Sequence, residues 1–389
     1  MLFRKLKLTS GIPISAFAAP VLVWLLVSNP TQAQSTLYHF NHLGQAEGLS
    51  SGQSNHYVYR DGAQRVWVSS TAGLNRFDGH RVWQYHRGPS PRSLPSEEAG
   101  WSDFCEDAAG RIWFTFEKGL TRYSPTTDSF ATYRFAVTGN DTLRDHYDFA
   151  WLDGRTDRLY FGAGDYLLSA PAEDVSAYRV ELAKSVNYKA RMVALPGGGV
   201  RLLDFYPGAT TLYVRDFSPN GVAAPPLTLH LPPGQIINEA LWHRRHGFLL
   251  VTDTGALQRR PGRTEWAPLA GPPELLPSEP VDGEFRGDTL VVATRQNGIY
   301  LVDLPSFTSR GPMHHVTERR VEAFSPQIER VNVDRAGVIW ISTPNDGVYY
   351  CDPRGAKFRF HPPPDVAALP VVDLAQSTDG QLLTLYNET

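Results

Sequence analysis

Histidines and carboxylates are the residues whose types come closest to those of a reactive or metal-binding site. The twelve histidines are scattered, and their nearest clusters are His243-x-x-His246 and His314-His315. A zinc site read from sequence needs histidines spaced with a further ligand such as a carboxylate, and neither cluster shows that pattern. Both lie beside arginine or turn residues, so we interpret them as solvated loop histidines and predict no metal site.

Signatures of phosphoryl transfer are missing from the sequence, which holds no phosphate-binding loop and no kinase motif. The adjacent carboxylates Glu97 and Glu98 lie in loop-like sequence. Neighbours in sequence are not by themselves a general acid/base pair. We therefore predict a chain that is not an enzyme, with no catalytic residues and no cofactor.

A repeat of about 45 residues organises the chain and decides where its side chains can meet. Three strong copies lie at residues 64–86, 110–134 and 337–361, each with a Trp-containing apolar strand, a Gly followed by Leu or Val, and a second strand. Trp67 and Trp340 are 273 residues apart, or six steps of 45.5, with weaker copies between them. Such a period with about four short strands per unit is typical of a propeller blade. We predict an all-β, seven-bladed β-propeller of four-stranded blades.

The recurring residues of this repeat are expected to be structural. The three tryptophans can fill the gaps between adjacent sheets, and they are Trp67, Trp113 and Trp340. Glycines at the turn from the second strand to the third are expected to take positive φ or a bulge, and they are Gly73, Gly119, Gly255, Gly298 and Gly347. Arg76 and Arg122 also recur, which favours pairing with a neighbouring blade.

The ends of the chain predict how the ring closes. Residues 38–42 resemble the last strand of a repeat without its inner three strands, and completing the final blade with them would remove an open sheet edge. Residues 357–361 then start a further unit, which residues 371–386 continue as two strands. The alternative is an eight-bladed ring with a truncated blade. We predict a signal peptide at 1–33, a propeller sensor domain at 34–354 and an incomplete further repeat at 355–389.

The first 33 residues indicate export. Three basic residues precede an apolar stretch, and Thr31-Gln32-Ala33 fits a cleavage site; an uncleaved membrane anchor is the alternative. The mature chain would carry 34 basic and 40 acidic residues, a poor match for nucleic acid. Cys105 and Cys351 fall in different repeats, so we expect two buried thiols, although an oxidising compartment would permit a disulfide.

Function is expected where the repeats differ, in the loops that enter each inner strand at one mouth of the ring. Polar groups with aromatic faces there would suit a sugar. The candidate ligand-binding residues are Asn55, Trp101, Asp103, Tyr147, Asp148, Arg191, Asn238, Glu239 and Arg330. The alternative for each of them is a solvated polar loop.

Three stretches of the first repeat resemble the two-component regulator propeller family. They read GLSS at 48–51, VYRDG at 58–62 and VWVSSTAGLNRFDG at 66–79. The family pattern has a GLS entry, a D-x-x-G turn and W-x-x-T-x-x-G-L-x-R-Y-D. The second and seventh copies are similar, while the middle repeats depart from the pattern.

The resemblance implies the periplasmic sensor region of a histidine kinase, often a hybrid kinase, of the type found in Bacteroidetes-like bacteria. It implies a small-molecule or oligosaccharide ligand, a homodimer formed through the parent receptor, and membrane attachment only through later parts that this chain does not contain. The chain is then a fragment of such a receptor or a solitary sensor. A secreted propeller enzyme, such as a lyase or hydrolase, and a passive interaction scaffold are the alternatives.

Overall fold

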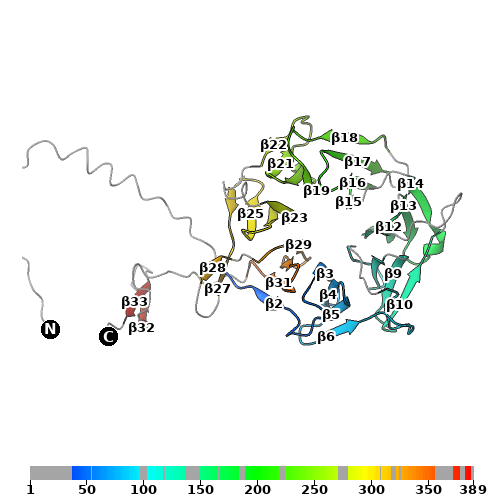
Figure 1. The fold of residues 1–389 in the computed structure, drawn as a ribbon. Coiled ribbons are helices and arrows are strands. Elements are labelled where there is room, and N and C mark those ends of the chain that lie inside the picture. The colour runs from blue at the N-terminus through cyan, green and yellow to red at the C-terminus, as the bar shows by residue number, and fades with distance from the viewer. Residues whose placement is uncertain are drawn as a thin grey trace, which may run out of the picture. The chain divides into compact units, whose positions relative to one another are not determined.

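The computed structural model shows a seven-bladed propeller whose blades follow one another around a ring in chain order (Figure 1). The residues that it describes are 37–53, 55–96, 103–116, 119–135, 147, 149–164, 166–183, 189–218, 224–269, 279–306, 308–316, 321–323, 326–354, 371–376 and 382–386. The proposed signal peptide lies outside these residues. Among the described residues, no helix has the length and apolarity needed to cross a bilayer.

Each of the first four blades is an antiparallel sheet of four consecutive strands. Blade 1 contains β3 (Asn55–Arg60), β4 (Val66–Ser70), β5 (Gly73–Phe77) and β6 (Val82–Tyr85). Blade 2 contains β7 (Cys105–Glu106), β8 (Ile112–Phe116), β9 (Gly119–Ser124) and β10 (Ser129–Tyr133). Blade 3 contains β11 (Ala150–Asp153), β12 (Arg158–Ala163), β13 (Tyr166–Pro171), a 3₁₀ turn (Val175–Ala177) and β14 (Arg179–Leu182). Blade 4 contains β15 (Lys189–Ala194), β16 (Val200–Phe205), β17 (Thr211–Phe217) and β18 (Leu227–His230).

Blades 5 and 6 also consist of four consecutive strands, whereas blade 7 takes its outer strand from the N-terminal part of the chain. Blade 5 contains β19 (Ile237–His243), β20 (Gly247–Thr252), β21 (Gly255–Arg259) and β22 (Ala267–Pro268). Blade 6 contains β23 (Pro280–Arg286), β24 (Thr289–Thr294), β25 (Ile299–Asp303) and β26 (Thr308–Arg310). Blade 7 contains β29 (Arg330–Val333), β30 (Ile339–Ser342), β31 (Val348–Cys351) and, as its outer strand, β2 (Asn41–Leu43). Smaller sheets join β1 (Leu37–Tyr38), β27 (His314–Val316) and β28 (Val321–Ala323), and separately β32 (Val371–Gln376) and β33 (Leu382–Tyr386).

The N-terminal strand completes the last blade, as the sequence predicted. Asn41 pairs with Tyr350 and Leu43 with Val348, so β2 covers the edge that β31 would otherwise expose. The predicted strand at 38–42 was too long at its start: β2 spans Asn41–Leu43, whereas Tyr38 belongs to β1, which pairs with β27. The seven four-stranded sheets exclude the eight-bladed alternative within the described residues.

The core is a series of apolar clusters between neighbouring blades. Trp67 of blade 1 is fully buried and packs in one cluster with Phe114 and Tyr123 of blade 2. The second strand of a blade is buried on both faces by its neighbours, which explains why β4 and β8 are buried along their whole length. Burial between sheets, rather than within one, makes each blade depend on the next.

Each of the three recurring tryptophans donates a hydrogen bond to an aspartate whose side chain is buried. The indole Nε1 donates to an aspartate oxygen six residues earlier, at 2.9 Å for Trp67 with Asp61 and 2.7 Å for Trp113 with Asp107. In blade 7, Trp340 and Asp334 make the same contact at 3.1 Å. A charged acceptor strengthens such a bond, so the turn that begins at the aspartate and the tryptophan form one structural unit. The turn reads D-x-x-G in blades 2 and 7, whereas blade 1 has Gln64 at the fourth position. The expectation that the tryptophans are structural is consistent with their burial.

The repeated glycines adopt the backbone that the sequence predicted. All five have positive φ: Gly73, Gly119, Gly255, Gly298 and Gly347. At Gly73, with φ of 123°, a Cβ would lie 2.4 Å from the carbonyl oxygen of Tyr85. Only glycine fits there without a shift of the backbone.

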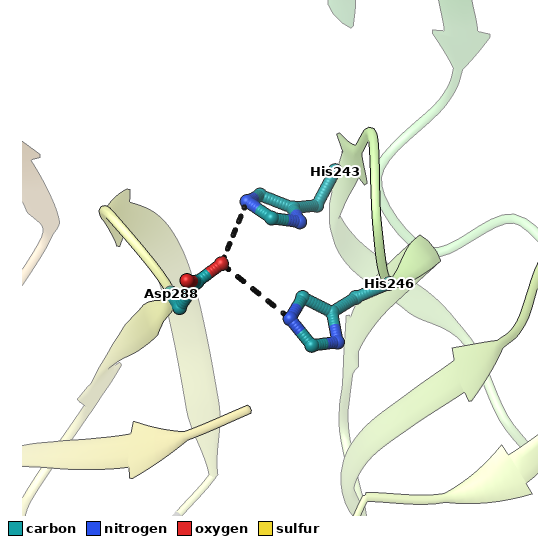
Figure 2. Close-up of side chains that lie close together, drawn as sticks. All are labelled: His243, His246 and Asp288. Atoms are coloured by element: carbon teal, nitrogen blue, oxygen red, sulfur yellow. Dashed lines mark ion pairs between the residues drawn. The ribbon is translucent and has the colours of Figure 1, made fainter. Parts of the chain in front are cut away.

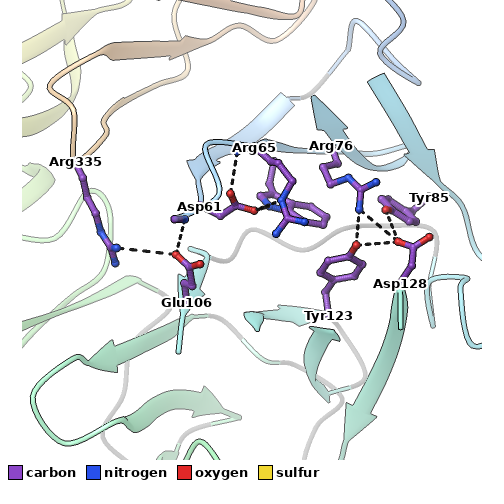
Figure 3. Close-up of polar contacts among 10 residues, drawn as sticks. Asp61, Arg65, Arg76, Tyr85, Glu106, Tyr123, Asp128 and Arg335 are labelled. Carbon is purple, nitrogen blue, oxygen red and sulfur yellow. Dashed lines mark hydrogen bonds and ion pairs between the residues drawn. The ribbon is translucent and has the colours of Figure 1, made fainter. Parts of the chain in front are cut away.

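The expected pairing between blades is observed for Arg76, whereas Arg122 lies over Trp113 and Tyr133 of its own blade. Arg76 of β5 donates to the Tyr123 hydroxyl of blade 2 and lies 3.4 Å from Asp128 (Figure 3). Asp128 accepts hydrogen bonds of 2.8 Å from Tyr85 and Tyr123. Burial opposes its ionisation, but these two hydroxyls and Arg76 outweigh burial and lower the pKa of Asp128.

At the inner turns, blade 2 also contacts blades 1 and 7 through one carboxylate. The amide of Gly62 donates to Glu106 at 2.7 Å, and Arg335 of blade 7 lies 4.0 Å from the same oxygen (Figure 3).

Cys105 and Cys351 are both buried as free thiols. Burial raises the pKa of the Cys351 thiol to about 12, so it is unreactive at neutral pH.

Candidate functional site

The innermost strands of the blades surround a polar cavity of about 190 Å³. Residues of blades 1, 2, 3, 4, 6 and 7 line it: Tyr57, Val58, Tyr59, Asp103, Phe104, Trp151, Arg191, Asp282, Glu284, Arg330, Val331, Asn332, Trp340 and Ser342. Side chains two positions apart on a strand point to the same side. This explains the pairs Tyr57 with Tyr59 and Asp282 with Glu284.

Arg191 is the central cation of this cavity and joins three blades. Its Nε lies 2.8 Å from Glu239 Oε1 on β19, and its Nη1 donates to Glu284 Oε2 on β23 at 2.7 Å. Glu239 is fully buried and also accepts a hydrogen bond from the amide of Ala240. Burial disfavours the charged guanidinium, but the surrounding carboxylates outweigh burial and raise the pKa of Arg191 well above its ordinary value.

A second arginine completes the far side of the cavity. The Arg330 guanidinium lies 4.4 Å from the centroid of the Tyr57 ring, a cation–π contact between blades 7 and 1. Asp282 of blade 6 accepts a 2.9 Å hydrogen bond from the amide of Val331. Burial raises the pKa of the Tyr57 hydroxyl, so this ring stays neutral in the physiological range.

The charged side chains in and beside the cavity include more carboxylates than arginines. Two arginines, Arg191 and Arg330, face four carboxylates, namely Asp103, Glu239, Asp282 and Glu284. Burial raises the pKa of Asp103, although both arginines oppose that effect. Burial therefore disfavours the charged form of Asp103, and the neighbouring carboxylates Glu239 and Glu284 act in the same direction.

The structure brings together four of the candidates named from sequence. Asp103, Arg191 and Arg330 line the cavity, and Glu239 reaches it through Arg191. Asn238 lies beside this group on β19, where its amide donates to the Pro280 carbonyl oxygen at 2.6 Å. These five candidates therefore come from blades 2, 4, 5 and 7.

Of the remaining candidates, Tyr147 lies apart from this group, and the other three fall outside the described side chains. Tyr147 is 5 % exposed and packs in the apolar cluster between blades 2 and 3, where its hydroxyl lies 3.4 Å from the amide of Phe135. Asn55 belongs to β3, but its side chain lies outside the described residues, as do Trp101 and Asp148. Sequence reasoning missed the aromatic lining residues Tyr57 and Trp151, which alternation along the inner strands could have revealed.

A serine motif near the entry to blade 1 has no catalytic surroundings. Gly48–Gly52 reads G-x-S-x-G, the pattern of a nucleophile elbow, which requires a strand–turn–helix context. Here it lies in the loop between β2 and β3, and the Ser50 hydroxyl lies 3.2 Å from the Ser70 hydroxyl. The Ser50 amide donates to Asn75 at 2.8 Å, so the segment anchors the loop to blade 1.

A second hollow of about 530 Å³ lies between blades 3 and 4. Its arginines are engaged within the chain: Arg155 binds Asp153 at 2.8 Å and donates to the Gly199 carbonyl at 2.6 Å. Arg158 donates to Ser169, which in turn donates to Glu181. Of these contacts, the one from Arg155 to Gly199 joins the two blades, and the others lie within blade 3. Because the central cavity gathers residues from six blades, it is the stronger candidate site.

The central cavity suits one small polar ring. Its volume equals that of roughly six water molecules at about 30 Å³ each, below the range of about 300–1,000 Å³ typical of pockets for larger ligands. Carboxylates accept hydrogen bonds from hydroxyl groups, guanidinium groups donate to ring and hydroxyl oxygens, and Tyr57, Tyr59 and Trp151 offer aromatic surface.

Known structures share this architecture. The extracellular domain of the putative hybrid two-component system BT3049 from B. thetaiotaomicron superposes with a TM-score of 0.64 and 17 % identity, over 89 % of this chain and 46 % of that one. The corresponding domain of BT4673 gives 0.61 and 14 %, over 89 % and 45 %. YCF48 bound to D1 peptide gives 0.60 and 9 %, over 83 % and 98 %.

No protein-family profile and no curated protein matches the sequence. The chain spans about half the length of the two extracellular domains that it matches. At these identities the likeness establishes the fold. The structural neighbours are of the kind that the sequence resemblance implied, and this chain shares its propeller fold with extracellular domains of hybrid two-component systems.

Proposed function

We propose that this chain is an extracytoplasmic sensor propeller of a two-component signalling receptor, and that it binds a saccharide-sized polyhydroxyl ligand in its central cavity. The observation that carries the proposal is the Arg191 cluster, which joins β15, β19 and β23 across the cavity. A ligand that binds between inner strands of different blades would change the packing between blades. Such a change is the signal that a receptor would transmit.

Direct binding tests the ligand part of the proposal. The mature chain, residues 34–389, is screened by thermal shift against a panel of neutral, acidic and amino sugars and their short oligosaccharides. We expect one class to raise Tm in a saturable way, because a ligand that binds only the folded state stabilises it. Calorimetry then gives the affinity for that sugar.

Asn332→Ala is the variant that ties the binding to the cavity. Asn332 lines the cavity from β29. Its side chain is uncharged, so its replacement leaves the ion pairs of Arg191 in place. We expect at least about tenfold weaker binding, since a polar partner of the sugar is lost. Tyr213→Ala on the outer part of blade 4 is the control, because Tyr213 is 46 % exposed. Equal affinity in both variants would place the ligand elsewhere.

We propose a periplasmic location, and the proposed signal peptide at residues 1–33 and the extracellular structural neighbours support it. We expect a fusion of residues 1–45 to alkaline phosphatase to be active in the periplasm. The receptor part is tested by reading the gene beyond codon 389. An open frame that continues into a membrane helix and a histidine kinase supports it; a stop codon with no such gene nearby contradicts it.

A secreted lyase or hydrolase is the second candidate function. It is favoured by Asp103, whose pKa burial raises in a cavity that two further carboxylates, Asp282 and Glu284, also line, because perturbed carboxyl groups are typical of acid/base sites. Against it, no histidine occurs among the described lining residues. Incubation with acidic and neutral polysaccharides, followed by assay of reducing ends and unsaturated products, distinguishes the two. If the unaltered chain cleaves a polysaccharide and Asp103→Asn abolishes the cleavage, the enzyme function would replace the sensor function as the proposal.

A further inference from the structure

Two histidines of blade 5 face one aspartate of blade 6. His243 and His246 flank the tight turn between β19 and β20, and Asp288 lies in the turn between β23 and β24 (Figure 2). One ligand atom from each side chain lies within 4.8 Å of the other two. Each histidine Nε2 lies 3.5 Å from the same oxygen, Asp288 Oδ1.

These distances suit a bridging ion better than direct hydrogen bonds. Hydrogen bonds from ring N–H groups to oxygen have heavy-atom distances of about 2.7–3.2 Å. Tetrahedral zinc binds imidazole nitrogen and carboxylate oxygen at about 2.0–2.2 Å, which separates neighbouring ligand atoms by roughly 3.4 Å. The two observed separations of 3.5 Å match that edge.

The histidines also depart from the repeat at this position. Blades 1, 2 and 7 place a buried aspartate at the first residue of the inner turn, where it accepts from the tryptophan six residues later. Blade 5 has His243 at that position and Leu249 six residues later, so no indole is available to bind. His243 is therefore free of the structural contact that fixes its counterparts.

The surroundings hold the three groups in place and leave one side open. The Phe285 ring packs 5.1 Å from the His243 ring, and Arg245 Nη1 lies 3.1 Å from Asp288 Oδ2, the oxygen that does not face the histidines. The side chains of His243 and His246 are 15 % exposed and that of Asp288 is 38 % exposed, so water can reach a fourth coordination position. The Arg245 charge lowers the affinity of Asp288 for a cation, but its contact is with Oδ2 and leaves Oδ1 open to the histidine side.

One local contact must change when the ion binds. The amide of Arg245 lies 3.3 Å from His243 Nδ1, which is long for a hydrogen bond. Coordination through Nε2 puts the proton on Nδ1, where water replaces the amide as its partner.

We propose that His243, His246 and Asp288 bind a divalent transition-metal ion of the zinc type, with water as the fourth ligand, and that the ion clamps blade 5 to blade 6. Two imidazoles and a carboxylate are donors that suit zinc. The same two inner strands, β19 and β23, carry Glu239 and Glu284, the partners of Arg191. The ion would therefore stiffen the strands that form one side of the central cavity. The proposal does not depend on the identity of the cavity's ligand.

The test uses residues 34–389 purified without a histidine tag and stripped with EDTA. Zinc chloride is titrated while Tm is recorded, and Co²⁺ replaces zinc for visible spectroscopy. We expect a saturable rise in Tm at one equivalent and the visible bands of tetrahedral cobalt. Magnesium should give neither, because it prefers oxygen ligands.

Single variants locate the ion. His246→Gln and Asp288→Asn should each weaken zinc binding by at least about tenfold and abolish the cobalt bands. His80→Gln is the matched control, since His80 is exposed in the β5–β6 turn and lies outside the cluster. Both variants are checked for native Tm without metal. Unchanged zinc binding in His246→Gln or Asp288→Asn, or no binding to the unaltered chain at micromolar zinc, would overturn the proposal.

Discussion

Replacement of Arg191 by methionine should destabilise the whole propeller. The change removes the cation that neutralises Glu239 and Glu284 but keeps most of the aliphatic stem. Glu239 is fully buried, and it keeps its contact with the Ala240 amide but loses the 2.8 Å ion pair with Arg191, so its charge is less well compensated. Glu284 retains the Phe285 amide and is 22 % exposed, so its charge remains partly solvated.

The size of the effect follows from these two environments. Removal of one partner from a buried ion pair costs about 3–5 kcal/mol. Because Glu284 is partly solvated, we expect the low end, about 3 kcal/mol in the free energy of unfolding. For a domain of this size each kcal/mol moves Tm by about 1–2 °C, so Tm should fall by about 4 °C.

Urea unfolding followed by tryptophan fluorescence and circular dichroism measures the loss. The triple variant Arg191→Met, Glu239→Gln, Glu284→Gln removes the charges together and should recover at least half of it, since no buried charge is then left without a partner. Two results would refute the reasoning. One is a loss below about 1 kcal/mol in the single variant; the other is a triple variant less stable than the single one.

Three further changes probe the repeat. Trp113→Phe removes the indole donor to Asp107 and should lower the free energy of unfolding in urea by about 1–3 kcal/mol. No loss would mean that this hydrogen bond does not stabilise the fold. Gly73→Ala should destabilise by at least about 1 kcal/mol more than Gly79→Ala, because both have positive φ but only Gly73 has a carbonyl 2.4 Å from the new Cβ. Asp128→Asn should destabilise at pH 7, and the loss should shrink as the pH falls below the unfolded-state pKa. The folded-state pKa of Asp128 is lowered, so its stabilisation is present above the unfolded-state value near 3.9 and disappears as pH falls through the folded-state value. A pH-independent difference between Asp128→Asn and the unaltered chain would argue against that linkage.

The fold was predictable because the repeat is a local pattern. Trp67, Gly73 and Arg76 each recur at a fixed distance, and the structure gives the first burial, the second positive φ and the third a partner on the next blade. The closing strand was predictable because residues 38–42 had the pattern of an outer strand without inner ones. Closure then followed from the cost of an open sheet edge.

The site was less predictable because it depends on contacts between blades. Arg191 and Glu239 were recognised as polar residues near the mouth, but their pairing depends on the rotation between blades 4 and 5. Tyr147 has the composition of a ligand-stacking residue, yet it packs in the core next to Phe135. Composition alone does not distinguish those two environments for a tyrosine.

The histidine cluster shows the same limit. Sequence reasoning looked for a carboxylate near His243 and His246 in the chain and interpreted both as solvated loop residues. The carboxylate that faces them, Asp288, is one repeat further on, and both histidine side chains are only 15 % exposed. In a ring of repeats, residues about 45 positions apart lie side by side, so spacing rules for helices fail.

The short N-terminal strand sets the order in which the ring can assemble. Asn41 and Tyr350 pair although almost the entire propeller lies between them in the sequence. Strand β2 contributes only three residues to this junction between β2 and β31. For an unstructured chain, closing a loop of that length costs about 5 kcal/mol of entropy, more than three strand residues readily repay. The blades between must therefore stack first and carry the two ends toward each other. The junction would form last in folding and open first under load, which makes the β2–β31 edge within blade 7 the place where this ring can open without unfolding its other blades.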